Sequence, residues 1–323
     1  MIVNYPRMRY RAAWPDDLDT ALEFSSANPF SISAPLNWDG KIEYTNGNGW
    51  KTWDGTAITS GKIGSNHCIY LRGTGNTKIT GRTADSAKWS IVGTNIACNG
   101  DIDLLLDYLT VKSGKHPTLA DRCYSFMFYG CTSLTAAPSL PATTLADSCY
   151  SSMFRGCTSL TTAPALPATT LAISCYAYMF YGCTSLTTAP ALPATTLAYG
   201  CYSFMFYGCT SLTAAPSLPA TTLASDCYYS MFNGCTSLTA ALSLPATTLR
   251  SRCYFFMFYG CTKIKLSATA SGTYTKPYRI PKSGVGTTTS NALDGMFANT
   301  GGTFKGTPEI NTTYYLDESN TIV

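Results

Sequence analysis

The sequence predicts an α/β solenoid of six 26-residue units, with an N-terminal β-rich domain and a C-terminal capping region. The first observation is the period, because the motif C-Y-x-x-M-F-x-G-C-T-S-L-T recurs with constant spacing. The second is that the residues before this motif form short alternating apolar runs, which are typical of strands. The units begin at Cys123, Cys149, Cys175, Cys201, Cys227 and Cys253. Repeats of this length cannot bury a core alone, so neighbouring units are expected to stack.

The N-terminal part divides into two segments. Residues 1–20 are expected to be an arm, either a simple extension or a segment that docks on a larger particle. The arm carries three arginines among aromatic residues: Arg7, Arg9 and Arg11. Residues 21–110 are expected to form a β-rich, sandwich-like leader domain, because short apolar runs alternate with Gly, Asn and Pro turns. In this domain residues 46–49 (NGNG) predict a hairpin, and residues 101–107 predict a short helix leading toward the repeats.

The repeats themselves occupy residues 111–266, and residues 267–323, rich in Gly and Thr, are expected to cap the open end of the array. In each unit we expect a short helix, over residues 123–131 in the first, because Gly130 suits a helix end. A short strand is expected at the Ser-Leu-Thr that follows. The Ala-Pro-x-Leu-Pro portion is expected to bend, because proline cannot donate a hydrogen bond to a strand ladder.

Two motifs of the array, MFYGCTSLT at residues 127–135 and LPATTL at residues 140–145, recur in nearly every unit. In these motifs the chain strongly resembles BspA-type leucine-rich repeats. Repeats of that type are found on surface proteins of gut bacteria and in tail or fibre proteins of their phages and prophages. The resemblance covers residues 117 to about 266. It implies a leucine-rich repeat fold and a role in recognition or adhesion.

Five positions of each unit stay constant, and in the first unit these are Cys123, Tyr124, Met127, Phe128 and Cys131. Five others change between units. On a helix of about 100° per residue the two sets occupy separate arcs, so the constant set is expected to pack inward and the changing set to face outward. The thirty changing positions hold eleven aromatic residues and no lysine or glutamate, a composition closer to a paratope than to a drifting solvated face.

The candidate ligand-binding residues are therefore the large side chains of this outer face: Phe126, Tyr129, Arg155, Tyr178, Tyr181, Tyr199, Phe204, Tyr207, Tyr229, Phe255, Phe256 and Tyr259. Other interpretations stay open. The rings could pack under the neighbouring unit or against another subunit, or the positions could simply drift. Ligands could also bind on the opposite, strand side of the array, where the threonines are Thr135, Thr161, Thr187 and Thr213.

Twelve of the fourteen cysteines lie at the two constant Cys positions. Two cysteines eight residues apart on one helix are separated by about 12 Å, which is too far for a disulfide. Because no export signal is recognisable, we expect reduced, buried thiols, although bridges between equivalent cysteines of adjacent units stay open. No C-x-x-C occurs and the only histidines are His67 and His116, so neither a metal site nor a cofactor is predicted.

Composition and motifs also argue against several classes of protein. A net charge of +4 on only 12% charged residues, with no basic run, argues against nucleic-acid binding. No apolar run reaches the length of a membrane span or a signal peptide, so we expect a soluble chain without membrane insertion. No hydrolase, phosphate-binding or metalloprotease motif occurs, and enzyme activity is not expected.

Together these observations predict a non-catalytic recognition or adhesion protein. The leading hypothesis is a fibre-like structural protein of a phage or prophage, made in the host cytoplasm and carried on the virion. Its solenoid would bind a host cell-surface glycan or protein, and other virion subunits, including copies of itself, would be its partners. One alternative is a virion structural protein whose aromatic solenoid face is a subunit interface. Another is a bacterial cell-surface adhesin.

Overall fold

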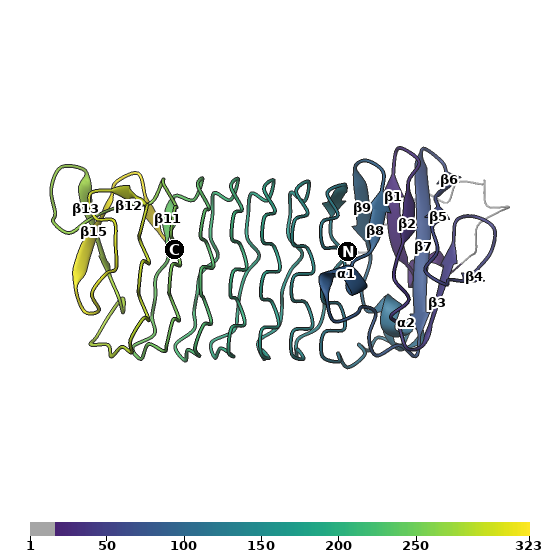
Figure 1. Cartoon of the computed structure of the whole chain (residues 1–323), viewed down its shortest axis with the longest axis horizontal. Coiled ribbons are helices and arrows are strands. Elements are labelled where there is room, and N and C mark those ends of the chain that lie inside the picture. The colour runs from purple at the N-terminus through teal and green to yellow at the C-terminus, as the bar shows by residue number, and fades with distance from the viewer. Residues whose placement is uncertain (1–16) are drawn as a thin grey trace.

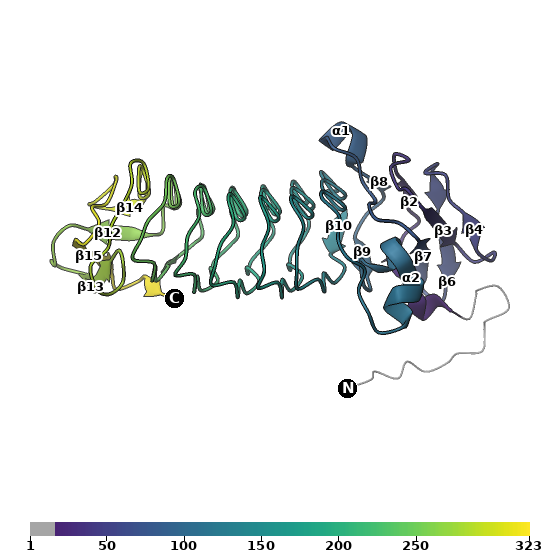
Figure 2. The same cartoon turned by 90° about the horizontal axis from the view of Figure 1, so that it is seen from below.

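The computed structural model describes residues 17–323, which form an elongated molecule with three parts along its long axis (Figure 1). A β-rich part makes one end, a row of chain turns makes the middle, and a smaller sheet makes the other end. Figure 2, rotated by 90°, shows the same order. The regular elements are mostly strands, and the helices within the described residues are short. Of the predicted arm, only residues 17–20 are described, and Arg7, Arg9 and Arg11 lie outside the described residues.

The N-terminal part contains two sheets, as the alternating apolar runs predict. The larger has the strand order β10-β9-β1-β7-β3-β4, with β6 also paired to β7. Its strands are β1 (Leu22–Ser26), β3 (Lys41–Thr45), β4 (Lys51–Thr52), β6 (Gly61–Ile63), β7 (Asn66–Thr74), β9 (Ile96–Asn99) and β10 (Leu134–Ala136). The smaller has the order β5-β2-β8 and comprises β2 (Ser31–Ser33), β5 (Ile58–Thr59) and β8 (Ser90–Val92). The predicted hairpin is confirmed, because β3 pairs antiparallel with β4.

One hydrophobic core serves both sheets and the first repeat. Trp89 lies at its centre, with its ring 5.3 Å from that of Trp53 and 6.3 Å from that of Phe128. Strand β10, which belongs to the first repeat, pairs in parallel with β9 and so extends the larger sheet. The boundary between the leader and the array stays a prediction.

The helices of the described chain are η1 (Leu18–Thr20), α1 (Ala84–Ala87) and α2 (Leu104–Lys112). The helix predicted from residue 101 begins three residues later, because the backbone at Asp101 forms a parallel bridge to Ser139 of the array. Ile102 donates its N–H to the Ser139 carbonyl at 3.1 Å. Backbone pairing between the leader and the array therefore uses Asp101 and Ile102, which were expected to begin the helix.

Successive 26-residue segments, called coils 1 to 6 here and starting at residues 121, 147, 173, 199, 225 and 251, lie side by side in the middle part (Figure 1). Two buried columns of rings cross them. Phe154, Phe180 and Phe206 stack at centroid distances of 5.7 and 5.6 Å, and the tyrosines that follow each first cysteine stack at 5.6 to 5.9 Å. The constant positions are buried in every coil, as expected.

The predicted helix over residues 123–131 is wrong, because these residues form a chain of β-turns. Alternate N–H groups bond three residues back, as Met127 does to Tyr124 at 3.2 Å, and the others bond the next coil, as Phe128 does to Met153 at 2.9 Å. Positive φ values of 58°, 60° and 72° recur at Arg122, Phe126 and Gly130, the third residue of a type II turn. The N–H groups that an α-helix would use internally hold adjacent coils together instead.

The predicted strand at Ser-Leu-Thr is present in coil 1, where β10 (Leu134–Ala136) overlaps it. In coils 2 to 4 isolated bridges take its place. Isolated parallel bridges join Ala136, Thr162, Thr188 and Ala214 in succession, each one residue beyond the expected Ser-Leu-Thr. A second ladder joins Thr144 to Thr170 and Thr196 to Thr222, at the Thr-Thr of the LPATTL motif, where no strand was predicted. The prolines lie between these two ladders, so they do not interrupt either one by lacking an N–H donor.

The C-terminal residues continue the stack before forming a small sheet. Phe297 stacks on Phe258 at 5.5 Å, and the N–H of Phe258 bonds the carbonyl of Met296. The terminal sheet has the order β13-β15-β12-β14, and β11 pairs separately with β16. These strands are β11 (Ala240–Ala241), β12 (Lys265–Ser267), β13 (Tyr274–Arg279), β14 (Gly301–Gly302), β15 (Thr313–Asp317) and β16 (Thr321–Ile322). The C-terminal residues thus lie against the last coil, and their role as a cap stays a prediction.

Candidate functional site

The five changing positions of each coil lie in the β-turn segment that begins the coil. They fall into two groups by burial. Five small side chains are buried: Ser125, Ser152, Ala177, Ser203 and Ser230. The predicted candidate residues are half-buried, apart from Tyr199, which is 50% exposed. The prediction that all changing positions face outward is therefore wrong for these five residues and for Asp226, which is also buried. The other serines at changing positions are half-buried or exposed.

Most candidate rings are stacked on one another between coils. Tyr178 lies 4.6 Å from Phe204 with an interplanar angle of 8°, and Tyr181 lies 4.5 Å from Tyr207 with an angle of 1°. Because parallel rings at this distance cover each other's faces, a ligand meets mainly their edges and hydroxyl groups. The expectation that rings pack against the neighbouring coil thus applies to these residues.

Arg155 lies in coil 2, where the series of outer rings is interrupted. Coil 2 carries serine and arginine where coils 1 and 3 carry aromatic residues. The Arg155 guanidinium lies 5.6 Å from the ring centre of Tyr129 and 4.4 Å from that of Tyr181. It is also 5.5 Å from the ring of Tyr178. The guanidinium therefore contacts rings of coils 1 and 3 through cation–π interactions, at a place where coil 2 has no ring of its own.

The series of stacked outer rings is interrupted in coil 5, where Ser230 and Asn233 occupy the positions that carry rings in coils 3 and 4. Tyr229, the residue before Ser230, continues the series: its ring lies 4.8 Å from that of Phe204, tilted by 50°, and stacks on Phe255 at 5.1 Å. Phe256 then contacts both Phe255 and Tyr259. The interruption leaves a hollow beside the rings of coils 3 to 5.

A pocket of about 310 Å³ occupies this hollow. Its walls include four of the predicted residues: Tyr178, Tyr199, Phe204 and Tyr229. Gly200 lies between them, where other coils carry Arg122, Ser148, Ser174, Asp226 or Arg252 at the equivalent position. A Cβ added to Gly200 would lie 3.2 Å from the Ser174 hydroxyl. The glycine therefore keeps the pocket open.

An ion pair forms one end of this pocket. Arg252 Nε lies 2.7 Å from Asp226 Oδ1, and Arg252 Nη2 donates to Oδ2 at 2.8 Å. The Asp226 side chain is only 10% exposed, and its carboxylate also accepts a hydrogen bond from Tyr199, which raises the pKa of that tyrosine. The sequence interpretation did not select Asp226 and Arg252. Their signal was available, because residues 26 apart occupy equivalent positions in adjacent coils and these two carry opposite charges.

The fourteen cysteines are all buried and unpaired. The second cysteine of each coil from 2 to 6 donates its S–H to the carbonyl of a phenylalanine in the preceding coil, for example Cys183 to Phe154 at 3.1 Å. Burial raises the pKa of the Cys183 thiol to about 12. The expectation of buried thiols is confirmed, and their hydrogen-bonding role was not foreseen.

One group of residues could hold a metal ion, although none was predicted. Ligand atoms of Asp101, Asp103 and His116 lie within 4.8 Å of one another near the junction of leader and array. Asp103 is fully buried and accepts a hydrogen bond from the Tyr124 hydroxyl at 3.1 Å. Burial, and then the neighbouring Asp101, raise the pKa of its carboxyl. Contacts within the protein already engage these carboxylates.

No protein family model, curated protein or solved structure matches this chain. Between residues 17 and 323 there is also no helix with the length and apolarity that crossing a bilayer requires.

Proposed function

We propose that this chain is a non-catalytic recognition protein whose coils form a BspA-type leucine-rich solenoid. It would act as a fibre-like structural protein of a phage or prophage virion and bind a host cell-surface glycan or protein. The observation that carries the proposal is the pocket at coils 3 to 5, which collects aromatic residues and an ion pair at positions that change between coils.

The chemistry of the pocket suits a ligand with both hydroxyl and apolar groups. Tyr199 is half exposed and has a hydroxyl group, while Tyr229 and Phe204 offer ring edges. Asp226 and Arg252 add a fixed acceptor and donor pair. Flat rings with few rotatable bonds lose little entropy on binding, which is why such side chains dominate recognition surfaces. A surface saccharide or a polar peptide loop has this combination of groups.

The test fills the pocket at a position where arginine already occurs in other coils. Gly200 has a φ of 58°, and the equivalent Arg122 and Arg252 have φ values of 58° and 51°. Gly200→Arg should therefore fold, at a cost of about 1–2 kcal/mol for a side chain at positive φ, and place a long side chain in the pocket. The matched control is Asn233→Arg, which adds the same charge outside the pocket where coil 2 already carries Arg155.

Both variants would be applied to an array of bacterial surface polysaccharides and to bacterial cells. Gly200→Arg should lose about tenfold or more in affinity, and Asn233→Arg should bind like the unmodified chain. Equal binding by all three proteins would reject the pocket as the ligand site.

A second candidate, a subunit interface within a particle, is favoured by a different observation. Ile173 and Tyr199 occupy equivalent positions in coils 3 and 4 and are 49% and 50% exposed. Two large exposed side chains in adjacent coils are common at protein interfaces. If Ile173→Ser with Tyr199→Ser turns an oligomer into a monomer in sedimentation velocity and leaves glycan binding intact, the interface is the better assignment.

A further inference from the structure

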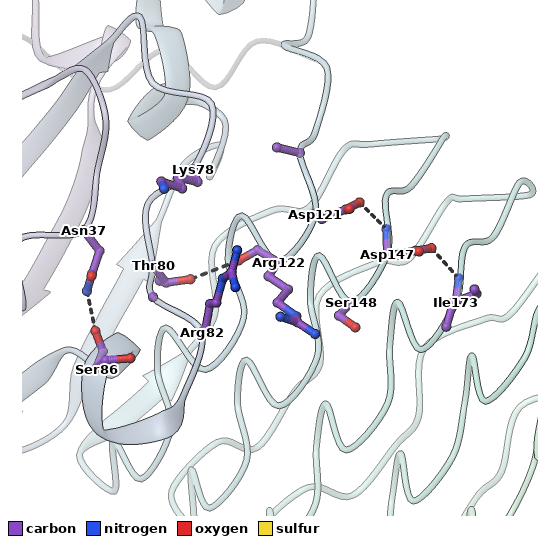
Figure 3. A pocket seen from close by; sticks show the side chains of 12 residues that line it. Asn37, Lys78, Thr80, Arg82, Ser86, Asp121, Arg122, Asp147, Ser148 and Ile173 are labelled. Atoms are coloured by element: carbon purple, nitrogen blue, oxygen red, sulfur yellow. Dashed lines mark hydrogen bonds between the residues drawn. The ribbon is translucent and has the colours of Figure 1, made fainter.

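A second cavity lies at the junction of the leader and the array, at residues that the sequence did not single out. It has a volume of about 870 Å³ and opens between the leader and coils 1 to 3. Figure 3 shows its side chains coming from a leader loop, with Lys78, Thr80 and Arg82, and from the coils, with Arg122, Asp147 and Ser148. A cavity of this size is typical of sites for small organic ligands rather than for single ions.

Backbone contacts fix the walls of this cavity. Ile79 donates its N–H to the Cys123 carbonyl at 2.9 Å, and Trp89 donates to Met127 at 2.8 Å. The Thr80 hydroxyl bonds the Arg122 carbonyl at 3.2 Å. The loop between these anchors is therefore held against coil 1 before any ligand arrives, which lowers the entropic cost of binding.

Three cations line the cavity, and within residues 17–323 none of them forms an ion pair: Lys78, Arg82 and Arg122. All three are exposed. Their gathering is unusual for this chain, because Arg155 is the only Lys or Arg between Cys123 and Leu249. Unpaired guanidinium groups bind carboxylate, sulphate and phosphate through paired hydrogen bonds.

The two carboxylates of the cavity do not neutralise these cations directly. Asp121 Oδ1 accepts the Asp147 N–H at 3.1 Å, and Asp147 Oδ1 accepts the Ile173 N–H at 2.9 Å. Each carboxylate thus has one oxygen bonded to the backbone of the next coil and one that can accept from a ligand hydroxyl. Ser148 adds a hydroxyl, and the half-exposed Ile173 adds an apolar contact.

We propose that this cavity binds an acidic saccharide, with its anionic group held by Arg82, Arg122 and Lys78 and its hydroxyls by Asp121, Asp147 and Ser148. Cations alone would suit any polyanion, but the added acceptors favour a ligand rich in hydroxyl groups. Among residues 17–323 no aromatic side chain lines the cavity, whereas proteins that hold single-stranded nucleic acid stack bases on aromatic rings. The site is separate from the pocket at coils 3 to 5, and either could exist without the other.

The experiment is a calorimetric titration of the full chain at low salt with five small-molecule probes and, separately, with a DNA oligonucleotide. Glucuronic acid, galactose 6-sulphate and glucose 6-phosphate distinguish the three anionic groups, galactose is the neutral sugar, and inorganic phosphate is the anion without a sugar. At least one acidic sugar should bind about tenfold more tightly than both galactose and inorganic phosphate, and added salt should weaken it.

The variant is Arg82→Gln with Arg122→Gln, and its control is Lys62→Gln with Arg250→Gln, which removes the same charge at exposed residues outside the cavity. The first should lose about tenfold or more in affinity for the acidic sugar, the control should not, and Gly200→Arg should bind normally. Lys78→Glu serves as a second variant if the double substitution fails to fold. Equal binding of galactose, binding of inorganic phosphate alone, or binding of a DNA oligonucleotide in place of the sugars would overturn the proposal.

Discussion

The Sγ atom of Cys157 lies 3.0 Å from the carbonyl oxygen of Phe128 in the preceding coil. The same carbonyl accepts the N–H of Cys131 at 3.0 Å, so both of its lone pairs are used. This relationship recurs at Cys183, Cys209, Cys235 and Cys261. The repeated cysteine is therefore a hydrogen-bond donor between coils as well as a small apolar side chain.

Replacing one of these thiols tests that role. Cys183→Ala should lower the free energy of unfolding by about 1–2 kcal/mol, because it removes the S–H donor and leaves a small void. Cys183→Ser, which keeps a donor, should cost less. Urea unfolding of both variants measures the difference. If serine is as costly as alanine or more so, sulfur volume decides the residue and the hydrogen bond does not.

Alkaline pH should destabilise the protein. Burial raises the pKa of Cys131, Cys175, Cys183 and Cys253 to about 12, from about 9 in an exposed thiol. Between these values the unfolded chain has lost the proton and the folded chain has kept it, so stability falls as pH rises, by up to about 1.4 kcal/mol per pH unit for each thiol. Below pH 9 both states keep the proton and the full stability is present.

The measurement is the free energy of unfolding in urea at intervals from pH 7 to 10.5, in the presence of a reductant. A flat profile up to pH 8.5 and a steep decline above it are expected. Constant stability up to pH 10.5 would contradict buried, neutral thiols.

Adjacent residues of coil 3 should differ sharply in their effect on stability. Phe180 is fully buried between two rings, and Phe180→Ala should cost about 3–5 kcal/mol. Tyr181 is only half-buried, although it stacks on Tyr207, and Tyr181→Ser should cost about 0.5–1.5 kcal/mol. Thermal and urea unfolding of the two variants provide the comparison. Similar losses would mean that the outer rings belong to the core.

A further prediction concerns Gly182, in the β-turn segment of coil 3. Its φ is 71° and an added Cβ would meet nothing within 4 Å, so Gly182→Ala should cost about 1–2 kcal/mol from backbone strain alone. Gly306→Ala is the control, because that glycine is equally open and has no positive φ. It should be neutral or stabilising by up to about 1 kcal/mol. Equal effects at the two sites would argue against the left-handed turn at Gly182.

The period and the inward-facing residues were predictable because they depend only on which side chains recur. The turn conformation was harder to foresee. Buried positions at Cys123, Tyr124, Met127, Phe128 and Cys131 follow a spacing of four, which a helix of 3.6 residues per turn approximates over two turns. A chain of turns with positive φ at every fourth residue has the same spacing, and the sequence alone does not distinguish the two.

The candidate site was predictable only in part. The rings around the pocket were selected because they change between coils, and Asp226 with Arg252 could have been selected from their 26-residue separation. The cavity at the junction had no such signal. Arg82 and Arg122 are brought together by hydrogen bonds of the leader loop to coil 1, and no spacing in the chain encodes that contact.

By itself, therefore, the sequence determined the repeat length, the burial of the constant side chains and the β-rich character of the leader, because apolar residues at regular spacing must be removed from water together. The tertiary structure decided the backbone conformation of residues 123–131 and the exposure of the outer rings. The physical reason is the same for both. A backbone N–H bonds whichever carbonyl is close, and a ring face stacks on whichever ring is close, and here those partners lie one coil away.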